Sequence, residues 1–199
     1  IEDLIQVEDM VVTVSHEGYI KRNPLTLYRQ QRRGGKGVTG METREEDFVE
    51  NLFVASTHDY VLLFTNQGRA FWLKVHQIPE AGRAARGKAV VNLIRLEAGE
   101  KVVGFLTTSE FRDDRFVVLA TREGKVKKTP LSSFSNARNN GVIALGVQDG
   151  DEMIAAVLSD GQNDVMLAPR DGLSIRFREE EVRPLGRTAA GRAGVGLRD

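Results

Sequence analysis

Short apolar runs separated by polar turns fill most of the chain, and within many of them apolar and polar positions alternate. Eight of these runs are rich in β-branched and aromatic residues, which is typical of strands. In chain order they are VVTV, NLFVAS, YVLLF, RAFWLKV, KVVGFLT, RFVVLAT, DEMIAAVL and DVMLA. No long segment has the 3.6-residue period of a helix, and only one short helix is expected, near HQIPEA at residues 76–81. The pattern therefore predicts an all-β fold.

A layout of apolar strand, glycine-containing turn and second strand with a basic residue occurs four times. The copies are VVTVSHEGYIKR, VLLFTNQGRAFWL, FVVLATREGKVKK and VMLAPRDGLSIRF, with turn glycines at Gly18, Gly68, Gly124 and Gly172. The period is therefore about 50 residues, which indicates a repeat architecture. Glycine adopts the positive φ of a tight turn at no steric cost, so each copy is predicted to be a β-hairpin.

A second element, rich in glycine, recurs with the same period and is called the Gly-rich element below. Its copies are QQRRGGKGVTGM (30–41), GRAARGKAVVNL (82–93), SFSNARNNGVIAL (133–145) and GRTAAGRAGVGL (186–197). The second and fourth copies align without a gap and the first fits the same frame, so that Gly35-Lys36, Gly87-Lys88 and Gly191-Arg192 coincide. The third copy is the weakest and has Asn139-Asn140 at that place. Units of about 50 residues with roughly four strands suit the blades of a propeller.

Charge is unevenly placed along a chain whose net charge is zero, with 28 basic and 28 acidic residues. Residues 18–41 contain basic side chains and no acidic ones, whereas residues 42–50 are mostly acidic. Such local patches, rather than the total, attract charged partners. The absence of cysteine excludes disulfides and thiolate metal sites. The apolar runs are too short to span a membrane, so no membrane partner is expected.

Three readings compete for the Gly-rich element. Gly35, Gly37 and Gly40 spell G-x-G-x-x-G, but no hydrophobic strand precedes them and no helical pattern follows, as a dinucleotide fold requires. The segment GRAARGKA begins like a P-loop but has Ala89 where a Ser or Thr must hold Mg²⁺. The third reading is a contact to a phosphate backbone, in which Arg and Lys bind the phosphates and glycine lets the main chain approach.

The recurrence of basic residues favours the third reading. If the blades surround one axis, corresponding elements lie on one rim and form a curved positive track for bent duplex DNA. The candidates on the Gly-rich elements after the first are Arg83, Arg86, Lys88, Arg138, Arg187 and Arg192. A second row, on the second hairpin strands, comprises Lys21, Arg22, Arg69, Lys125, Lys127, Lys128, Arg176 and Arg178.

The heptapeptide QRRGGKG resembles the gyrase A box, the motif that marks the C-terminal domain of DNA gyrase A. It comprises Gln31, Arg32, Arg33, Gly34, Gly35, Lys36 and Gly37. EDMVVTVSHEGYIKR, ARGKAVVNL and VKKT also look like parts of that domain, so the resemblance covers essentially the whole chain. It implies a β-pinwheel, a propeller-like disc of four-stranded antiparallel blades, with about four blades here.

The resemblance also implies a function. The family's domain binds and wraps duplex DNA on its basic rim without strong sequence specificity, and so supports ATP-dependent negative supercoiling. The implied partners are the rest of gyrase A and the gyrase B protein in a heterotetramer, in the bacterial cytoplasm near the chromosome. ATP and Mg²⁺ would act elsewhere in the enzyme, and no cofactor is expected in this domain. The family's domain usually has six blades, so residues 1–199 are expected to be one C-terminally truncated domain.

Catalytic chemistry is not expected in this chain. Tyr19, Tyr28 and Tyr60 match no catalytic tyrosine motif, and the neighbours Ser15 and His16 would point to opposite faces of a strand. The remaining expectations are that His16, His58 and His76 bind no metal, that Trp72 lies in a blade core and that Glu179–Glu181 form a solvated face.

Two alternatives remain open. One is a propeller-like protein-interaction module that uses the acidic residues 42–50. The other is the equivalent domain of topoisomerase IV, although that domain generally lacks an intact box.

Overall fold

The computed structural model describes residues 2–28, 35, 37, 39–43, 47–170 and 172–194. The strands are β1 (Asp9–Ser15), β2 (Tyr19–Pro24), β3 (Val49–Ser56), β4 (Tyr60–Thr65), β5 (Arg69–Lys74), β6 (Lys88–Ala89), β7 (Val102–Thr108), β8 (Phe116–Thr121), β9 (Lys125–Pro130), β10 (Val142–Ile143), β11 (Met153–Ser159), β12 (Asp164–Leu167), β13 (Ile175–Arg178) and β14 (Arg192–Ala193). The 3₁₀ helices are η1 (Glu2–Leu4), η2 (Leu25–Leu27), η3 (Val75–Gln77), η4 (Val90–Asn92), η5 (Leu131–Phe134) and η6 (Glu179–Glu181). All eight runs predicted as strands are strands, and the all-β prediction is confirmed.

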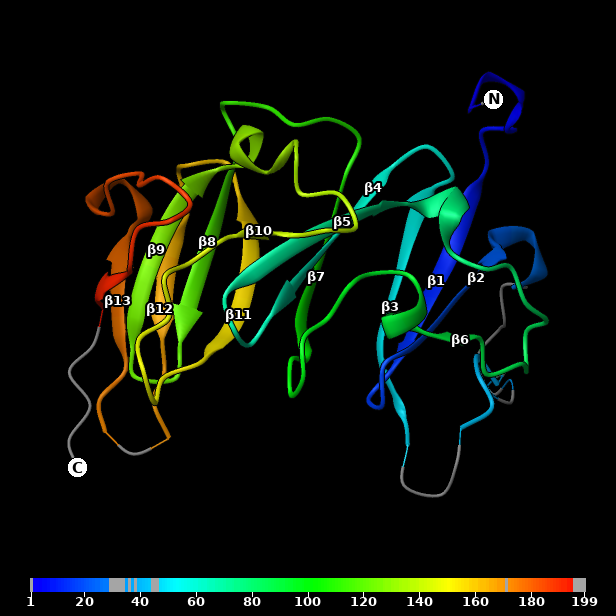
Figure 1. Ribbon diagram of the computed structural model, residues 1–199, viewed down its shortest axis with the longest axis horizontal. Helices are drawn as coiled ribbons and strands as arrows, with labels where there is room; N and C mark the ends of the chain where they lie inside the picture. The colour runs from blue at the N-terminus through cyan, green and yellow to red at the C-terminus, as the bar shows by residue number, and fades with distance from the viewer. Residues whose placement is uncertain are drawn as a thin grey trace. The chain divides into compact units, whose positions relative to one another are not determined.

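The described strands form three four-stranded sheets and one two-stranded sheet (Figure 1). Their orders are β3-β1-β2-β6, β10-β5-β4-β7, β11-β8-β9-β14 and β12-β13. In each four-stranded sheet a predicted hairpin forms the two central strands. A long strand at the end of the same repeat pairs with the first hairpin strand, and the two-residue strand of the next repeat's Gly-rich element pairs with the second. The predicted four-stranded blades are confirmed for three repeats.

Glycine and a hydroxyl group shape the hairpin turns. The turn glycines have the predicted positive φ, at 81° for Gly18, 80° for Gly68, 80° for Gly124 and 132° for Gly172. In three hairpins the last residue of the first strand accepts a hydrogen bond from the first main-chain N–H of the second strand. These 3.2 Å bonds join Ser15 to Tyr19, Thr65 to Arg69 and Thr121 to Lys125. The side chain thereby satisfies a donor that the tight turn leaves without a ladder partner.

A carboxylate that lies just before the third strand of each sheet closes each of these three turns. Asp47 Oδ1 accepts hydrogen bonds from the N–H groups of Glu17 and Phe48, both at 2.9 Å. Burial raises the pKa of Asp47, but these bonds, a bond from Ser15 and the charge of Arg86 hold the pKa below its ordinary value. The counterparts in the later repeats are Glu100, which accepts from Thr65 at 2.7 Å, and Asp151, which accepts from the N–H of Glu123 at 3.0 Å.

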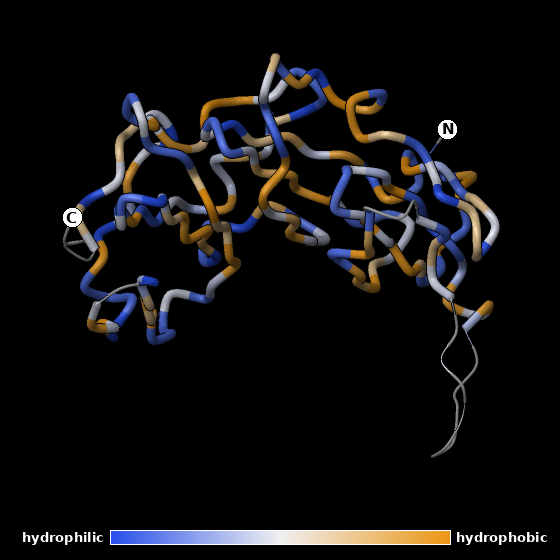
Figure 2. Tube along the Cα trace, turned by 90° about the horizontal axis from the view of Figure 1, so that it is seen from below, coloured by the Kyte–Doolittle hydropathy of each residue, from blue (hydrophilic) through white to orange (hydrophobic). Residues whose placement is uncertain are grey.

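The chain divides into two compact units, Ile1–Val61 with Leu73–Arg95 and Leu62–Trp72 with Leu96–Asp199, and the division passes through the β4–β5 hairpin. The core of the first unit includes Val12, Val14 and Ile20, all at most 1% exposed. In the core of the second unit the ring of Phe64 meets that of Phe134 edge to face, with centroids 5.5 Å apart. Along the trace the apolar stretches alternate with hydrophilic loops (Figure 2).

A 3₁₀ turn follows every hairpin, and the expected helix near residues 76–81 is the one at Val75–Gln77. In η3 and η5 this turn buries the apolar Val75 and Leu131, whereas in η6 it buries Glu179. The predicted solvated face is therefore wrong for Glu179, whose carboxylate accepts a hydrogen bond from Ser159.

Trp72 differs from the sequence prediction as well. It is half-buried rather than in a core, because its indole N–H donates to the carbonyl of Ser135 at 3.0 Å and its ring lies beside that of Phe111. The indole needs a hydrogen-bond partner, and the 135–140 loop supplies one at the margin of the sheet.

Candidate nucleic-acid interface

The box QRRGGKG lies mostly outside the described residues, because Gln31, Arg32, Arg33, Gly34 and Lys36 are not among them. Gly35 and Gly37 are described, and both are exposed. The structural argument for the interface therefore rests on the later copies of the Gly-rich element.

Each later copy contributes a short strand that pairs with the second strand of the hairpin in the preceding repeat. The register joins Lys88 to Ile20, Val142 to Ala70 and Arg192 to Val126. Since the three hairpin residues are equivalent, Gly87, Gly141 and Gly191 occupy one structural position. The sequence alignment is thus confirmed for the second and fourth copies. It is wrong by two residues for the third, where Gly141-Val142, not Asn139-Asn140, holds this place.

The glycine at this position is needed for close packing. A Cβ on Gly87, whose φ is +86°, would lie 2.5 Å from the carbonyl oxygen of Ile20. A Cβ on Gly191 would lie 3.1 Å from the carbonyl oxygen of Val126. The first contact is closer than a side-chain carbon tolerates, and the second would require its neighbours to shift by a few tenths of an ångström. Glycine therefore lets the element lie directly against the hairpin. The first role of the glycine at this position is therefore to allow close packing of the Gly-rich element on the hairpin.

Four candidate bases on the Gly-rich elements are exposed. They are Arg83, Lys88, Arg138 and Arg192. None of them makes an ion pair with another residue that the structure describes. Arg and Lys side chains in this state keep their donors available for an anion. Every later copy of the element therefore presents at least one such base.

Arg22 and Arg69, on the second hairpin strands, are engaged within the protein. Arg22 donates from Nε to the carbonyl oxygen of Ile78 at 2.7 Å and from Nη1 to Glu80 at 3.1 Å. Arg69 donates to the buried carboxylate of Glu100 at 2.8 Å. Their side chains are only 16% and 20% exposed, so much of their donor capacity is directed inward.

Arg86, Lys125 and Arg187 are half-buried. The guanidinium of Arg86 lies 3.5 Å from the centroid of the Tyr19 ring and 2.5 Å from a carboxylate oxygen of Glu17. The other two donate to neighbouring oxygen atoms, Lys125 to the Gln148 side chain and Arg187 to the Ile143 carbonyl at 3.1 Å. These three bases would have to exchange a partner to bind a phosphate.

Lys21, Lys127 and Lys128 correct the sequence prediction, because all three are buried. The ammonium group of Lys21 donates to Gly82 O at 3.0 Å, and that of Lys128 donates to Glu179 O at 2.9 Å. The ammonium group of Lys127 is surrounded by main-chain carbonyls. Burial lowers the pKa of Lys21, and it lowers that of Lys127 to about 8 with a further contribution from the charge of Arg187. A phosphate does not reach these groups.

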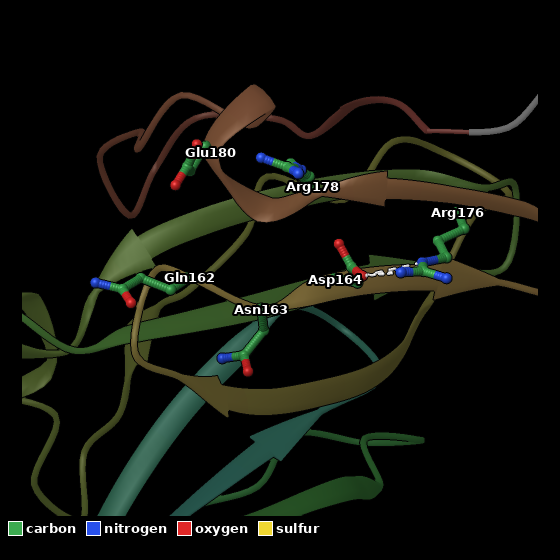
Figure 3. A pocket seen from close by; sticks show the side chains of 6 residues that line it. All are labelled: Gln162, Asn163, Asp164, Arg176, Arg178 and Glu180. Carbon is green, nitrogen blue, oxygen red and sulfur yellow. Dashed lines mark hydrogen bonds and ion pairs between the residues drawn. The ribbon is translucent and has the colours of Figure 1, made fainter.

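Sequence reasoning missed a polar pocket of about 380 Å³ at the β12–β13 hairpin. Figure 3 shows its lining, which comprises Gln162, Asn163, Asp164, Arg176, Arg178 and Glu180. Arg176 pairs with Asp164 across the hairpin. Two arginines and two carboxylates cancel in charge, so the pocket is a poor site for phosphate, although both arginines belong to the second basic row. The signal in the sequence was limited to the two basic residues on the second strand of this hairpin, Arg176 and Arg178.

The histidines serve contacts within the protein. His16 stacks on Phe48 with ring centroids 4.7 Å apart, and His58 Nε2 donates to the carbonyl oxygen of Ile5 at 2.8 Å. Among the described residues, no cluster of His, Cys, Asp or Glu is arranged to hold a metal ion. No helix in the described part of the chain is long and apolar enough to cross a membrane.

The chain matches a known protein family over nearly its whole length. The model of the DNA gyrase C-terminal domain, a β-propeller, matches residues 9–56, 59–109, 115–160 and 163–199. The matched segments begin at the strands or loops that open each repeat, so the four matches follow the four repeats.

Individual relatives give the same result. The chain is 50% identical over 197 residues to DNA gyrase A of Haemophilus influenzae and to that of Salmonella typhimurium, and 46% identical to that of Escherichia coli. Each alignment covers 99% of this chain and 22% of the relative, so the chain spans about a fifth of these proteins.

Solved structures share the fold. The C-terminal domain of DNA topoisomerase IV superposes with a TM-score of 0.83 at 28% identity, covering 98% of this chain and 59% of that one. A DNA gyrase A C-terminal domain superposes with a TM-score of 0.76 at 24% identity, covering 96% of this chain and 62% of that one. The fold is thus shared by both enzymes, whereas the sequence identity is higher to the gyrase A proteins named above.

Proposed function

The chain belongs to the DNA gyrase C-terminal domain family, a non-catalytic part of a type II topoisomerase, and from this premise we propose that it binds and bends duplex DNA. The observation that supports the proposal is the recurrence of exposed bases on the Gly-rich elements. Arg83, Lys88, Arg138 and Arg192 come from three successive repeats and share one structural element. A duplex offers phosphates at regular intervals, so repeated bases suit repeated contacts along it.

The contacts are to the backbone rather than to the bases. Direct readout in the major groove uses a helix or a two-stranded ribbon whose side chains reach base edges. The helices that the structure describes have at most four residues, too few for a recognition helix. We therefore propose sequence-tolerant binding, in which preference among sites follows the ease of bending the DNA.

In the complete enzyme the wrapped DNA would support ATP-dependent negative supercoiling. The proposed partners are the remainder of gyrase A and the gyrase B protein in a heterotetramer, in the bacterial cytoplasm. ATP and Mg²⁺ would be used by those other parts. This domain, with residues 1–199 taken as one pinwheel, would need no cofactor.

The test is a topology assay with this chain alone. Relaxed circular DNA is incubated with increasing protein in the presence of a relaxing enzyme, and the linking number is measured after the protein is removed. Wrapping predicts a linking-number shift that grows with protein concentration. Binding to a short duplex is measured in parallel, and the logarithm of its affinity should fall by about 0.9 per phosphate contact for each tenfold rise in salt. Weak, salt-independent binding and an unchanged linking number would instead support a protein-interaction module.

A further inference from the structure

The ammonium group of Lys127 lies inside a cluster of four main-chain carbonyl oxygens. Nζ is 2.5 Å from the oxygens of Ala144 and Arg187, 3.0 Å from that of Gly186 and 3.1 Å from that of Ala189. Three of the four oxygens belong to the Gly-rich element of the fourth repeat. An ammonium group has three N–H donors, so at least one of them is shared between two oxygens. The lysine is 0% exposed, and these oxygens replace the water that its charge has lost.

The same arrangement occurs in the other compact unit. Lys21 also lies three residues after its turn glycine, is 0% exposed, and donates to the carbonyl oxygens of Gly82 and Arg83 in the Gly-rich element of the second repeat. In the remaining four-stranded sheet this hairpin position is Phe71, and a Cβ on Gly141 would lie 2.6 Å from its ring. Two elements therefore rest on a buried ammonium group, and the third rests on an aromatic ring.

The fourth Gly-rich element has no large apolar side chain up to Gly194 that could fix its conformation. The fourth copy consists of glycine, alanine, threonine and arginine up to Gly194, and its strand has only two residues. The lysine, by contrast, comes from the central strand β9, which is paired on both sides. A buried carbonyl oxygen that loses its donor destabilises the local structure, so removing the ammonium group should release the element and leave the strand in place.

We propose that Lys127 and Lys21 are positioning residues that hold the basic Gly-rich elements in the conformation that meets the phosphate backbone of DNA. Lys127 would position Arg187 and Arg192, and Lys21 would position Arg83 and Lys88. Neither lysine touches the DNA itself. The role in DNA binding rests on the proposed function, whereas the role in fixing the elements does not.

The first experiment measures hydrogen exchange at single amides in Lys127→Met and Lys21→Met. Methionine keeps the length of the buried stem and removes the donors. In Lys127→Met we expect exchange at Ala189 and Gly194, whose amides bond within the element and to the hairpin turn, to accelerate about tenfold or more. Exchange at Ala85 and Val90, the corresponding amides of the second repeat, should stay at the parental rate. Lys21→Met should give the opposite pattern.

The second experiment measures affinity for a short duplex, with the exposed Lys101→Met as a control for the loss of one charge. Both buried-lysine variants should bind several-fold more weakly than the control. Propylammonium, which replaces the side-chain atoms removed in Lys127→Ala, should restore slow exchange at Ala189 and DNA affinity. Tetramethylammonium at the same concentration has the same charge and screens DNA equally but has no N–H donor, so it should restore neither.

The outcomes separate the two claims. Equal acceleration in both elements would mean that the lysines only stabilise the whole fold, and it would overturn the inference. So would selective loosening with DNA affinity equal to that of the control, or equal rescue by both cations. If the parent chain binds no DNA, the proposed function fails, and the exchange pattern still decides whether the lysines fix the elements.

Discussion

Removing the exposed bases of the Gly-rich elements should weaken DNA binding far more than removing the same charge elsewhere. The variant changes Arg83, Lys88, Arg138 and Arg192 to alanine. If each base contacts one phosphate, the slope of log affinity against log salt should become less steep by about 3.6, from about 0.9 per contact. At 0.15 M salt, with the affinity at 1 M unchanged, this corresponds to a loss of about a thousandfold.

The matched control removes four exposed arginines that already have acidic neighbours. Arg112, Arg122 and Arg176 each pair with a carboxylate, and Arg115 lies beside Asp114. Both variants lower the net charge by four, so a general electrostatic effect would weaken them equally. Both variants should unfold at nearly the same temperature as the parent, because an exposed substitution usually changes the free energy of unfolding by less than about 0.5 kcal/mol.

The assay is fluorescence anisotropy of a labelled duplex over a series of salt concentrations. The expected result is a parental slope in the control and a shallower slope in the quadruple variant. Equal slopes in the two variants would refute the reasoning, because the four bases would then contribute no more than any other positive charge.

The box, a buried carboxylate and a packed glycine give three more predictions. Changing Arg32, Arg33 and Lys36 together to alanine should leave the affinity for a short duplex largely intact but abolish the linking-number shift. Bending a 20–30 bp stretch costs about 1–6 kcal/mol, and the contacts that these three bases make would no longer offset that cost. An undiminished shift would contradict this prediction. Asp47→Asn should lower the free energy of unfolding at pH 7. The folded-state pKa of Asp47 is below its ordinary 3.8, so its contribution is present above that value and is lost as the pH falls through the lowered pKa; acid titration of unfolding should show the parent and variant converging. Gly87→Ala should destabilise the fold by roughly 1–3 kcal/mol in urea unfolding, because it combines positive φ with a close main-chain contact; an unchanged midpoint would count against that packing.

Local sequence patterns were sufficient to predict the hairpins, but they were insufficient to predict how the strands pair into sheets. An alternating strand and a glycine at a tight turn are properties of neighbouring residues, and Gly18 and Gly124 have the expected positive φ. The third strand of each sheet lies at the far end of the same repeat and the fourth comes from the next repeat, so their pairing depends on contacts across many residues. The two-residue error at Asn139 arose there, because the register is fixed by Val142 against Ala70 and not by sequence likeness.

The candidate interface was predicted as a set of basic residues, and the structure divides that set. Lys127 and Lys128 read as surface residues because a lysine on a short strand is usually solvated. Their burial depends on carbonyl oxygens of residues 144 to 189, which no local pattern reveals. Glu179 was misread for the same reason, since its partner Lys128 lies in another repeat. The exposed bases of the Gly-rich elements needed no distant partner, and their exposure could be predicted.

The outer strands of each sheet come later in the chain than its hairpin, and this order has a consequence for synthesis on the ribosome. The hairpin β1–β2 is complete once Pro24 has emerged, but its sheet needs β3 and then β6, which ends at Ala89. Each hairpin therefore has two open edges until the third strand has emerged, and one open edge until the Gly-rich element of the next repeat has emerged. The β12–β13 hairpin, which pairs with no third strand among the described residues, has the strand content of such a waiting stage. Late, long-range pairing of this kind slows folding and exposes edges to association with other nascent chains.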